Sequence, residues 1–223
     1  INKADGEKLK TIPTEENLIK NDFVNSLVLF KESLFYLNTY GSLYSIDSSR
    51  TIRWFINLNQ SLDINPNSLF YSNPILLYKD KLVVSTDLYL YVLNANTGST
   101  FFKIAITSLL KPIVSGKSLF LVTKDDLLVC INLDTGKIMY SIDISQNIAN
   151  YLDTKKKSID IKSFAIANND LLLFLNNSYL VKFALKGTIK DIHKLPSKLK
   201  SFPLFINGSI VYLNDKNKLI IYN

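Results

Sequence analysis

A motif that recurs along the chain constrains the fold more than any other feature. Its two clearest copies begin at Pro74 and Pro112. Each runs through three short apolar segments to an Asn 20 residues after the proline, and to a Thr-Gly pair whose Gly follows the proline by 24 residues. A third copy begins at Pro203 and reaches Asn223, again after 20 residues. The fold must therefore repeat one structural unit of this size.

Two weaker copies lack the proline. They span residues 27–54 and 164–188, and in both the turn after the third apolar segment is one residue shorter. Residues 1–6 match the end of a further copy, because their Asn and Gly are also four residues apart. We therefore assign five approximate repeats, which are residues 21–60, 66–106, 107–144, 158–195, and 196–223 together with 1–14.

Each repeat predicts four short strands. Its apolar segments are rich in Val, Ile, Leu, Tyr and Phe, are separated by polar turns, and have no long period of 3.6 residues, so we expect little helix. Four antiparallel strands in a repeat of roughly 38 to 51 residues are typical of a β-propeller blade. We predict an all-β fold in which residues 1–223 form a single β-propeller domain with about five blades visible, each a four-stranded antiparallel sheet.

The shifted register of the repeats leaves two interpretations of the ring. In one, the segment Glu7–Ile12 supplies the outermost strand of the last blade, so that the ring closes without a free edge. In the other, the sequence belongs to a longer propeller of seven or eight blades, because it begins at Ile1 within a repeat.

The composition excludes several classes of site. With 47% hydrophobic and 20% charged residues in 223, the chain is globular. One Cys and one His exclude an intrachain disulfide, a CxxC redox pair, a Cys-rich zinc site and a two-His metal site. A hydrolase would have to depend on His193 alone. We therefore expect no catalytic, cofactor-binding or metal-binding residues.

For five residues the sequence favours a structural role over a catalytic or ligand-binding one, and these are Trp54, Phe102, Cys130, Tyr140 and His193. We expect His193 in or just after the outer strand of its blade, partly open to water, and Cys130 as a small buried hydrophobic residue in a third strand. Trp54, Phe102 and Tyr140 share one place in the repeat, which favours packing between blades over a ligand cage.

Polar and basic segments offer the candidates for partner contact. We interpret the insertion with Lys155-Lys156-Lys157 as a solvated loop; the alternative is contact with an acidic partner, anionic lipid or phosphate. Tyr40, Tyr71, Tyr89 and Tyr151 lie near turns, but they do not define a partner-binding site. Asp125-Asp126 is expected to form a hairpin turn rather than to bind Ca²⁺.

The overall charge and hydropathy bear on nucleic acid and membrane binding. We treat the formal charge of +7 as modest and spread along the chain, without the interleaved basic and aromatic residues of a single-strand groove. Nucleic acid is therefore not an expected partner. No apolar run approaches the roughly 18 to 20 residues that span a bilayer, so no membrane span is expected.

The repeat resembles a known one. The clearest copies begin with Pro-Ile-(Leu/Val) and continue through two apolar strands that end in (Leu/Ile)-Asn. An (Asp/Asn)-Thr-Gly turn follows, with an aromatic residue four positions after the Gly. This pattern is similar to the PQQ-like propeller repeat. Residues 74–102 and 112–140 match it best, with Phe102 and Tyr140 where that repeat usually has Trp; Trp54 keeps the Trp. Quinoprotein dehydrogenases, BamB-like lipoproteins of the outer-membrane β-barrel assembly machinery and other envelope propellers share this repeat.

The resemblance implies either a quinone-dependent enzyme or a scaffold, and the Cys and Trp content of the chain favours the scaffold. A quinone (PQQ)-dependent dehydrogenase would commonly need a vicinal Cys pair and more tryptophan, whereas this chain has one Cys and one Trp. We therefore expect a non-enzymatic protein-interaction scaffold of the bacterial cell envelope, with a BamB-like role in outer-membrane β-barrel assembly. Its partner would be a protein such as a β-barrel assembly component. It would lie in the periplasm or at the periplasmic face of the outer membrane, with any lipid anchor outside this sequence.

Two alternatives remain open. One is a PQQ-dependent dehydrogenase-like propeller. The other is a cytoplasmic WD-repeat-like interaction module, although no copy carries that repeat's Gly-His or Trp-Asp signature.

Overall fold

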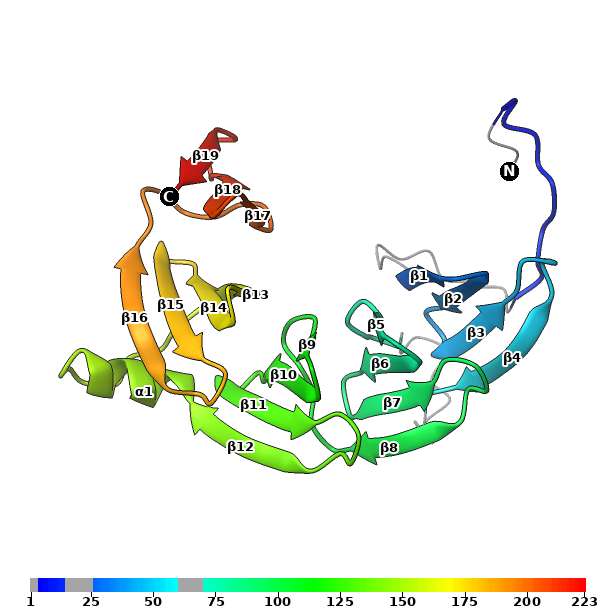
Figure 1. Cartoon of the computed structure of the whole chain (residues 1–223), viewed down its shortest axis with the longest axis horizontal. Coiled ribbons are helices and arrows are strands. Elements are labelled where there is room, and N and C mark those ends of the chain that lie inside the picture. The colour runs from blue at the N-terminus through cyan, green and yellow to red at the C-terminus, as the bar shows by residue number, and fades with distance from the viewer. Residues whose placement is uncertain (1–3, 15–25, 60–69) are drawn as a thin grey trace. The chain divides into compact units, whose positions relative to one another are not determined.

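A computed structural model describes residues 4–14, 26–59 and 70–223 (Figure 1). The chain divides into two compact units, Ile1–Thr107 and Ser108–Asn223. Five antiparallel sheets make up nearly all of the regular structure, and in each of them the strands pair in the order in which they follow in the sequence. This meander is the pattern of propeller blades, so the predicted all-β propeller fold is confirmed.

The first unit contains two four-stranded blades. Blade 1 consists of β1 (Ser26–Phe30), β2 (Ser33–Leu37), β3 (Ser42–Ile46) and β4 (Ile52–Asn57). Blade 2 consists of β5 (Leu76–Tyr78), β6 (Lys81–Ser85), β7 (Leu90–Asn94) and β8 (Thr100–Ile104).

The second unit contains three blades and a helix. Blade 3 consists of β9 (Ile113–Ser115), β10 (Ser118–Val122), β11 (Leu127–Asn132) and β12 (Ile138–Asp143). The helix α1 (Ile144–Tyr151) follows it directly. Blade 4 consists of β13 (Ile161–Ala167), β14 (Asp170–Leu175), β15 (Tyr179–Ala184) and β16 (Ile189–Lys194). Blade 5 consists of β17 (Leu204–Ile206), β18 (Ser209–Leu213) and β19 (Leu219–Tyr222).

Each hydrophobic core lies between neighbouring blades of one unit. Blades 1 and 2 enclose a core that includes Phe35, Leu43 and Leu82, all no more than 1% exposed. Blades 3 and 4 enclose another around Phe120 and Phe183. Blade 4 also shares a core with blade 5, so its second strand β14 has a core on each side, which explains why that strand is apolar at almost every position instead of alternating with polar residues.

The turn between the third and fourth strands explains the spacing of the repeat. In blade 2 the side-chain oxygen of Asn94 accepts hydrogen bonds from the amides of Asn96 and Thr97, at 2.8 and 3.2 Å. The amide of Gly98 closes the turn onto the Asn94 carbonyl at 2.8 Å, and Gly98 has a φ of 75°. An Asn four residues before a Gly is therefore what this turn needs, since Gly takes positive φ without strain.

The weaker repeats close this turn over three residues instead of four. The Arg50 amide donates to the Asp47 carbonyl at 3.0 Å in blade 1, and the Gly187 amide donates to the Ala184 carbonyl at 2.8 Å in blade 4. The predicted one-residue shortening is confirmed in both copies.

A β-bulge marks the place of the recurring aromatic residue. Trp54, Phe102 and Tyr140 pair with the third-strand residue that directly precedes a register shift, in blades 1, 2 and 3 respectively. In blade 4 this place belongs to Asp191, which pairs with Lys182 just before its own register shift. The three aromatics, which share one place in the repeat, therefore also share one structural position.

Two of these aromatics pack against the following blade. The ring of Trp54 lies over Gly98, and the ring of Tyr140 lies over Gly187. Tyr140 also donates a hydrogen bond from its hydroxyl to the Leu185 carbonyl, at 2.6 Å. Packing between blades, predicted from the repeat, is confirmed for Trp54 and Tyr140.

Blade 5 has three strands among the described residues, where the repeat predicted four. Residues 4–14 form no strand, so pairing of the segment Glu7–Ile12 with this blade is not found within the described part of the chain. Leu219 and Ile221 on β19 are 64% and 63% exposed. The third strands β7 and β11, each covered by a fourth strand and a neighbouring core, are buried along most of their length.

Candidate interaction surface

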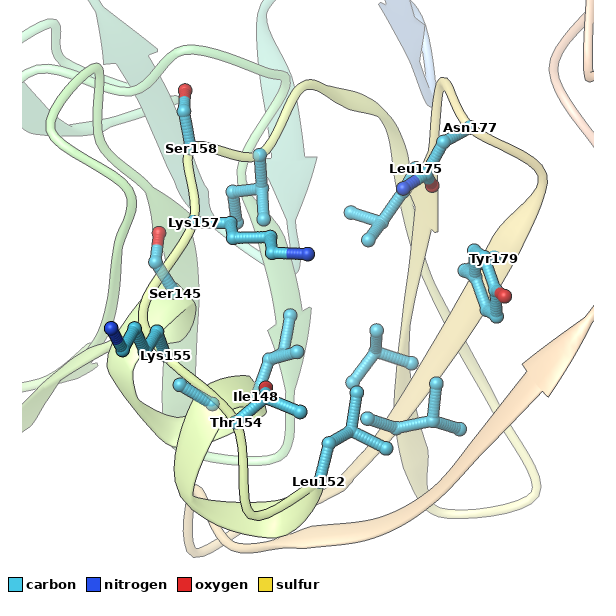
Figure 2. A pocket seen from close by; sticks show the side chains of 14 residues that line it. Ser145, Ile148, Leu152, Thr154, Lys155, Lys157, Ser158, Leu175, Asn177 and Tyr179 are labelled. Carbon is cyan, nitrogen blue, oxygen red and sulfur yellow. The ribbon is translucent and has the colours of Figure 1, made fainter.

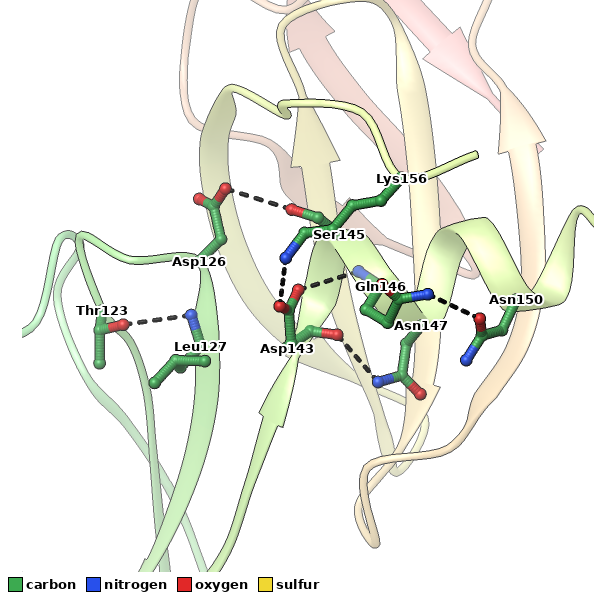
Figure 3. A network of polar contacts seen from close by, with 9 residues as sticks. All are labelled: Thr123, Asp126, Leu127, Asp143, Ser145, Gln146, Asn147, Asn150 and Lys156. Carbon is green, nitrogen blue, oxygen red and sulfur yellow. Dashed lines mark hydrogen bonds and ion pairs between the residues drawn. The ribbon is translucent and has the colours of Figure 1, made fainter. Parts of the chain in front are cut away.

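The insertion between blades 3 and 4 is a folded element with its own anchors. Asp143 ends β12 and is the N-cap of α1, because its side chain accepts a hydrogen bond from the Gln146 amide at 2.9 Å (Figure 3). The Asn147 side chain donates to the Asp143 carbonyl at 2.8 Å. The Ile144 amide donates to the Asp126 carbonyl at 2.9 Å, which connects the helix to the turn between β10 and β11.

The residues after the helix are held to the same carboxylate. Lys156 lies 2.5 Å from Asp143 through its ammonium group, which brings the loop back to the start of α1 (Figure 3). The hydrogen bond from Lys156, followed by the one from the Gln146 amide, lowers the pKa of the Asp143 carboxyl. At the far end of α1, the hydroxyl of Tyr151 donates to the Lys190 carbonyl on β16, at 3.3 Å.

A cavity of about 380 Å³ lies between this insertion and blade 4 (Figure 2). Seven apolar side chains from α1, the following loop and the blade line it, and these are Ile148, Ala149, Leu152, Ile159, Leu175, Val181 and Ile192. Polar side chains complete the lining, and these are Ser145, Thr154, Ser158, Asn177 and Tyr179 with Lys155 and Lys157. Its volume lies in the range of ligand-binding pockets, and its lining is divided equally between apolar and polar or charged residues.

The cavity has a positive lining. Neither Lys155 nor Lys157 forms an ion pair with any residue that the structure describes, whereas Lys156 between them is paired with Asp143. The ammonium of Lys157 points into the space between the insertion and blade 4, and that of Lys155 points away from it (Figure 2). No carboxylate lines the cavity.

The charge of the whole chain has the same bias. Residues 108–223 contain 16 Lys and 9 Asp, which accounts for the entire net charge of +7. Residues 1–107 contain 10 Lys and Arg against 10 Asp and Glu. The expectation that the charge is spread along the chain is therefore wrong, because the excess belongs to the unit that carries the cavity.

Large side chains are exposed around the cavity. Leu152 and Tyr179, which line it, are 49% and 36% exposed, and the neighbouring Tyr151 is 48% exposed. Of the other tyrosines proposed for partner contact, Tyr71 is exposed, while Tyr40 and Tyr89 are half-buried.

Tyr179 was not among the residues predicted for partner contact, and Lys155–Lys157 were interpreted as a solvated loop, with contact to an acidic partner, anionic lipid or phosphate as the alternative. The three lysines are exposed as expected, but two of them line a cavity. A signal for Tyr179 was present in its position, because it is a large residue that begins a third strand directly after a turn, where Ser178 has a φ of 69°. Its proximity to α1 depends on the tertiary fold.

The remaining candidates have structural surroundings. His193 lies in the outer strand β16 and is partly exposed, as predicted; its Nε2 is 2.9 Å from Asp191 Oδ2, outside hydrogen-bonding geometry. Cys130 is 4% exposed in the core between blades 3 and 4, where burial raises the pKa of its thiol. Asp125 and Asp126 form the turn between β10 and β11, with a φ of 58° at Asp126.

Neither a metal site nor a membrane-spanning helix is found among the described residues. No group of three or more His, Cys, Asp or Glu side chains in residues 4–14, 26–59 and 70–223 could hold a metal ion. In the same ranges, no helix is long and apolar enough to cross a bilayer.

Comparisons with known proteins place the fold. No family model and no curated protein sequence matches the chain. Its structure is similar to BamB from Moraxella catarrhalis, with a TM-score of 0.56 and 9% identity over 87% of this chain and 70% of that one. It is similar to BBS1N, solved in complex with ARL6DN, with a TM-score of 0.60 and 14% identity over 86% of this chain and 60% of that one.

A designed protein has the same fold. The computationally designed Ika8 protein matches with a TM-score of 0.58 and 10% identity, over 91% of this chain and 71% of that one. The chain thus spans about 60 to 70% of the length of these structures. At such low identities the likeness concerns the fold alone.

Proposed function

We propose that this chain is a non-enzymatic protein-interaction scaffold whose contact surface is the insertion between blades 3 and 4. The observation that carries the proposal is the anchored cavity, with an apolar lining, two unpaired lysines and exposed Leu152, Tyr151 and Tyr179 around it. Exposed aromatic residues beside an apolar depression are typical of protein-interaction surfaces. Anchoring the insertion at Asp143 and Tyr151 reduces the entropy lost when a partner binds.

The proposed setting is the bacterial cell envelope, with a BamB-like role in outer-membrane β-barrel assembly. The PQQ-like character of the repeat and the likeness of the fold to BamB support this setting. BBS1N, a second similar structure, was solved with a bound protein, which supports a scaffold function for a propeller of this kind. The proposed location is the periplasm or the periplasmic face of the outer membrane, and the proposed partner is a component of the β-barrel assembly machinery.

Affinity purification from the organism's envelope fraction tests this function. The tagged chain should retain a β-barrel assembly component, and the charge reversal Lys157→Glu should reduce the recovered amount. Failure to recover any such component would contradict the proposed role in assembly.

A thermal-shift assay tests the catalytic alternative. Adding PQQ and Ca²⁺ should leave the melting temperature unchanged, since a ligand that binds the native state stabilises it by mass action. A saturable increase would contradict the non-enzymatic assignment.

A further inference from the structure

The cavity between α1 and blade 4 has a chemistry that selects one kind of occupant. We propose that it binds a short acidic peptide segment of the partner protein, in which carboxylates flank one or two large apolar side chains. This proposal rests on the scaffold function proposed above and adds the chemical class of the segment that the scaffold recognises.

The apolar lining provides for the large side chains of the segment. Leu175 and Val181 are buried in the wall formed by blade 4, and Ile148 and Ile192 are half-buried on opposite sides. Leu152 is 49% exposed at the end of α1, so apolar surface is left for a ligand to cover. Burying such surface is the main source of favourable binding free energy.

The lysines provide for the acidic residues. The Lys157 ammonium points into the cavity, has no ion pair among the described residues, and faces a lining without Asp or Glu (Figure 2). The whole net charge of +7 lies in residues 108–223, so the field around the cavity favours an anionic ligand. Opposite charges across an interface raise the association rate and select the partner.

Polar side chains around the cavity suit a peptide backbone. The hydroxyl groups of Thr154, Ser158 and Tyr179 and the amide of Asn177 can each donate and accept hydrogen bonds. A phosphodiester chain or a lipid headgroup would use the lysines but leave the apolar wall uncovered. The combined lining therefore favours a peptide over nucleic acid or a membrane surface.

Fluorescence anisotropy with three labelled hexapeptides tests the proposal on the purified chain. The first has the sequence Glu-Glu-Leu-Phe-Glu-Glu, the second replaces its apolar pair with two serines, and the third replaces its glutamates with lysines. The first should bind with a Kd below about 1 mM and at least about tenfold more tightly than the others. No binding of the first peptide, or equal binding of the first and second, would overturn the proposal.

Variants locate the binding. Lys157→Glu and Leu152→Ser change exposed side chains, so the fold should be retained, and each should weaken binding of the first peptide about tenfold. The control Lys186→Glu reverses another exposed lysine of blade 4, in the turn at the other end of β15, and should leave the Kd within twofold. An equal loss in Lys157→Glu and in the control Lys186→Glu would show general charge attraction and overturn the site.

A vesicle arm separates the peptide from a lipid surface. Vesicles with 30% phosphatidylglycerol should not displace the first peptide, and Lys157→Glu should not alter cosedimentation with them. Displacement of the peptide together with a loss of cosedimentation in Lys157→Glu would assign the cavity to lipid. Recovery of an assembly component in the envelope purification, without peptide binding here, would overturn this inference and leave the scaffold function intact.

Discussion

Trp54 and Gly98 make the contact that joins blades 1 and 2 at the outer strand. A Cβ added at Gly98 would lie 2.7 Å from the indole ring, and Gly98 has a φ of 75°. Tyr140 and Gly187 repeat the arrangement between blades 3 and 4, where the corresponding distance is 3.0 Å. The glycine of the repeat thus serves the turn of its own blade and the packing of the preceding one.

Gly98→Ala should destabilise the first unit by about 2 to 4 kcal/mol, because it combines a left-handed backbone with a steric clash against Trp54. Gly116→Ala is the matched control. Gly116 also has a positive φ, of 60°, but a Cβ there would meet nothing within 4 Å, so we expect a loss of about 1 kcal/mol. Urea denaturation followed by Trp54 fluorescence for Gly98 and by circular dichroism for Gly116 measures both, and equal losses would contradict the packing argument.

Tyr140→Phe should cost about 1 kcal/mol, because it removes the hydrogen bond to the Leu185 carbonyl and leaves that acceptor without its donor. The fold should persist, since Phe102 holds the equivalent position in blade 2. Tyr179→Phe is the control, because its hydroxyl has no hydrogen bond among the described residues, and it should leave the unfolding midpoint unchanged.

Alkaline titration offers a second test of Tyr140. Burial, followed by the proximity of Cys130, raises the pKa of its phenol. In the unfolded chain the phenol of Tyr140 would ionise at about pH 10. The contribution of the neutral, buried phenol to the stability of the folded chain is therefore fully present below that pH and is lost as the pH rises further. Absorbance at 295 nm should show a late phase of tyrosine ionisation, to which Tyr91 also contributes because burial raises the pKa of its phenol, and this phase should be smaller in Tyr140→Phe.

The carboxylate of Asp47 should make the stability of its turn depend on pH in the acid range. Its carboxylate accepts hydrogen bonds from the Ser49 hydroxyl at 2.6 Å and the Thr51 amide at 2.9 Å, and these lower its pKa to about 2. The turn is therefore stabilised at pH values above the unfolded pKa of about 3.9, and this contribution is lost as the pH falls towards 2. Carbon-detected NMR should give a midpoint near 2, and Ser49→Ala should raise it; a midpoint near 4 in the unmodified chain would contradict the assignment.

Asp143 should govern the order of the insertion. Asp143→Ala removes the N-cap of α1 and the partner of Lys156, so we expect a loss of about 1 kcal/mol and faster hydrogen exchange in residues 144–151. Lys156→Ala keeps the cap and removes only an exposed ion pair, so we expect a loss of at most about 0.5 kcal/mol. Equal exchange rates in the two variants would show that the cap does not hold the helix.

The repeat made the blades predictable, and particular residues show why. The turn at Asn94 and Gly98 recurs in blade 3, and the bulge at Phe102 recurs in blades 1, 3 and 4. Local hydrogen bonds and strand periodicity act within a single repeat, so a single sequence reveals them. The shortened turns of blades 1 and 4 followed from the same pattern, whereas the predicted fourth strand of blade 5 is not found among the described residues.

The candidate site was not predictable in the same way. The helix α1 has eight residues, and so short a helix gives only a weak periodic signal in the sequence. It also depends on the cap at Asp143. Its cavity joins Leu152 in the insertion to Tyr179 and Ile192 on two strands of blade 4, a proximity that exists only after the chain has folded.

Site-specific photo-crosslinking in the envelope of living cells tests the central claim most directly. A benzophenone amino acid at Tyr179 should form an adduct with a protein of the β-barrel assembly machinery, and Lys157→Glu should reduce its yield. The same probe at Tyr71, an exposed tyrosine of the other unit, should give no such adduct. An adduct at Tyr71 with none at Tyr179 would contradict the claim that the insertion between blades 3 and 4 is the surface through which this propeller binds its partner.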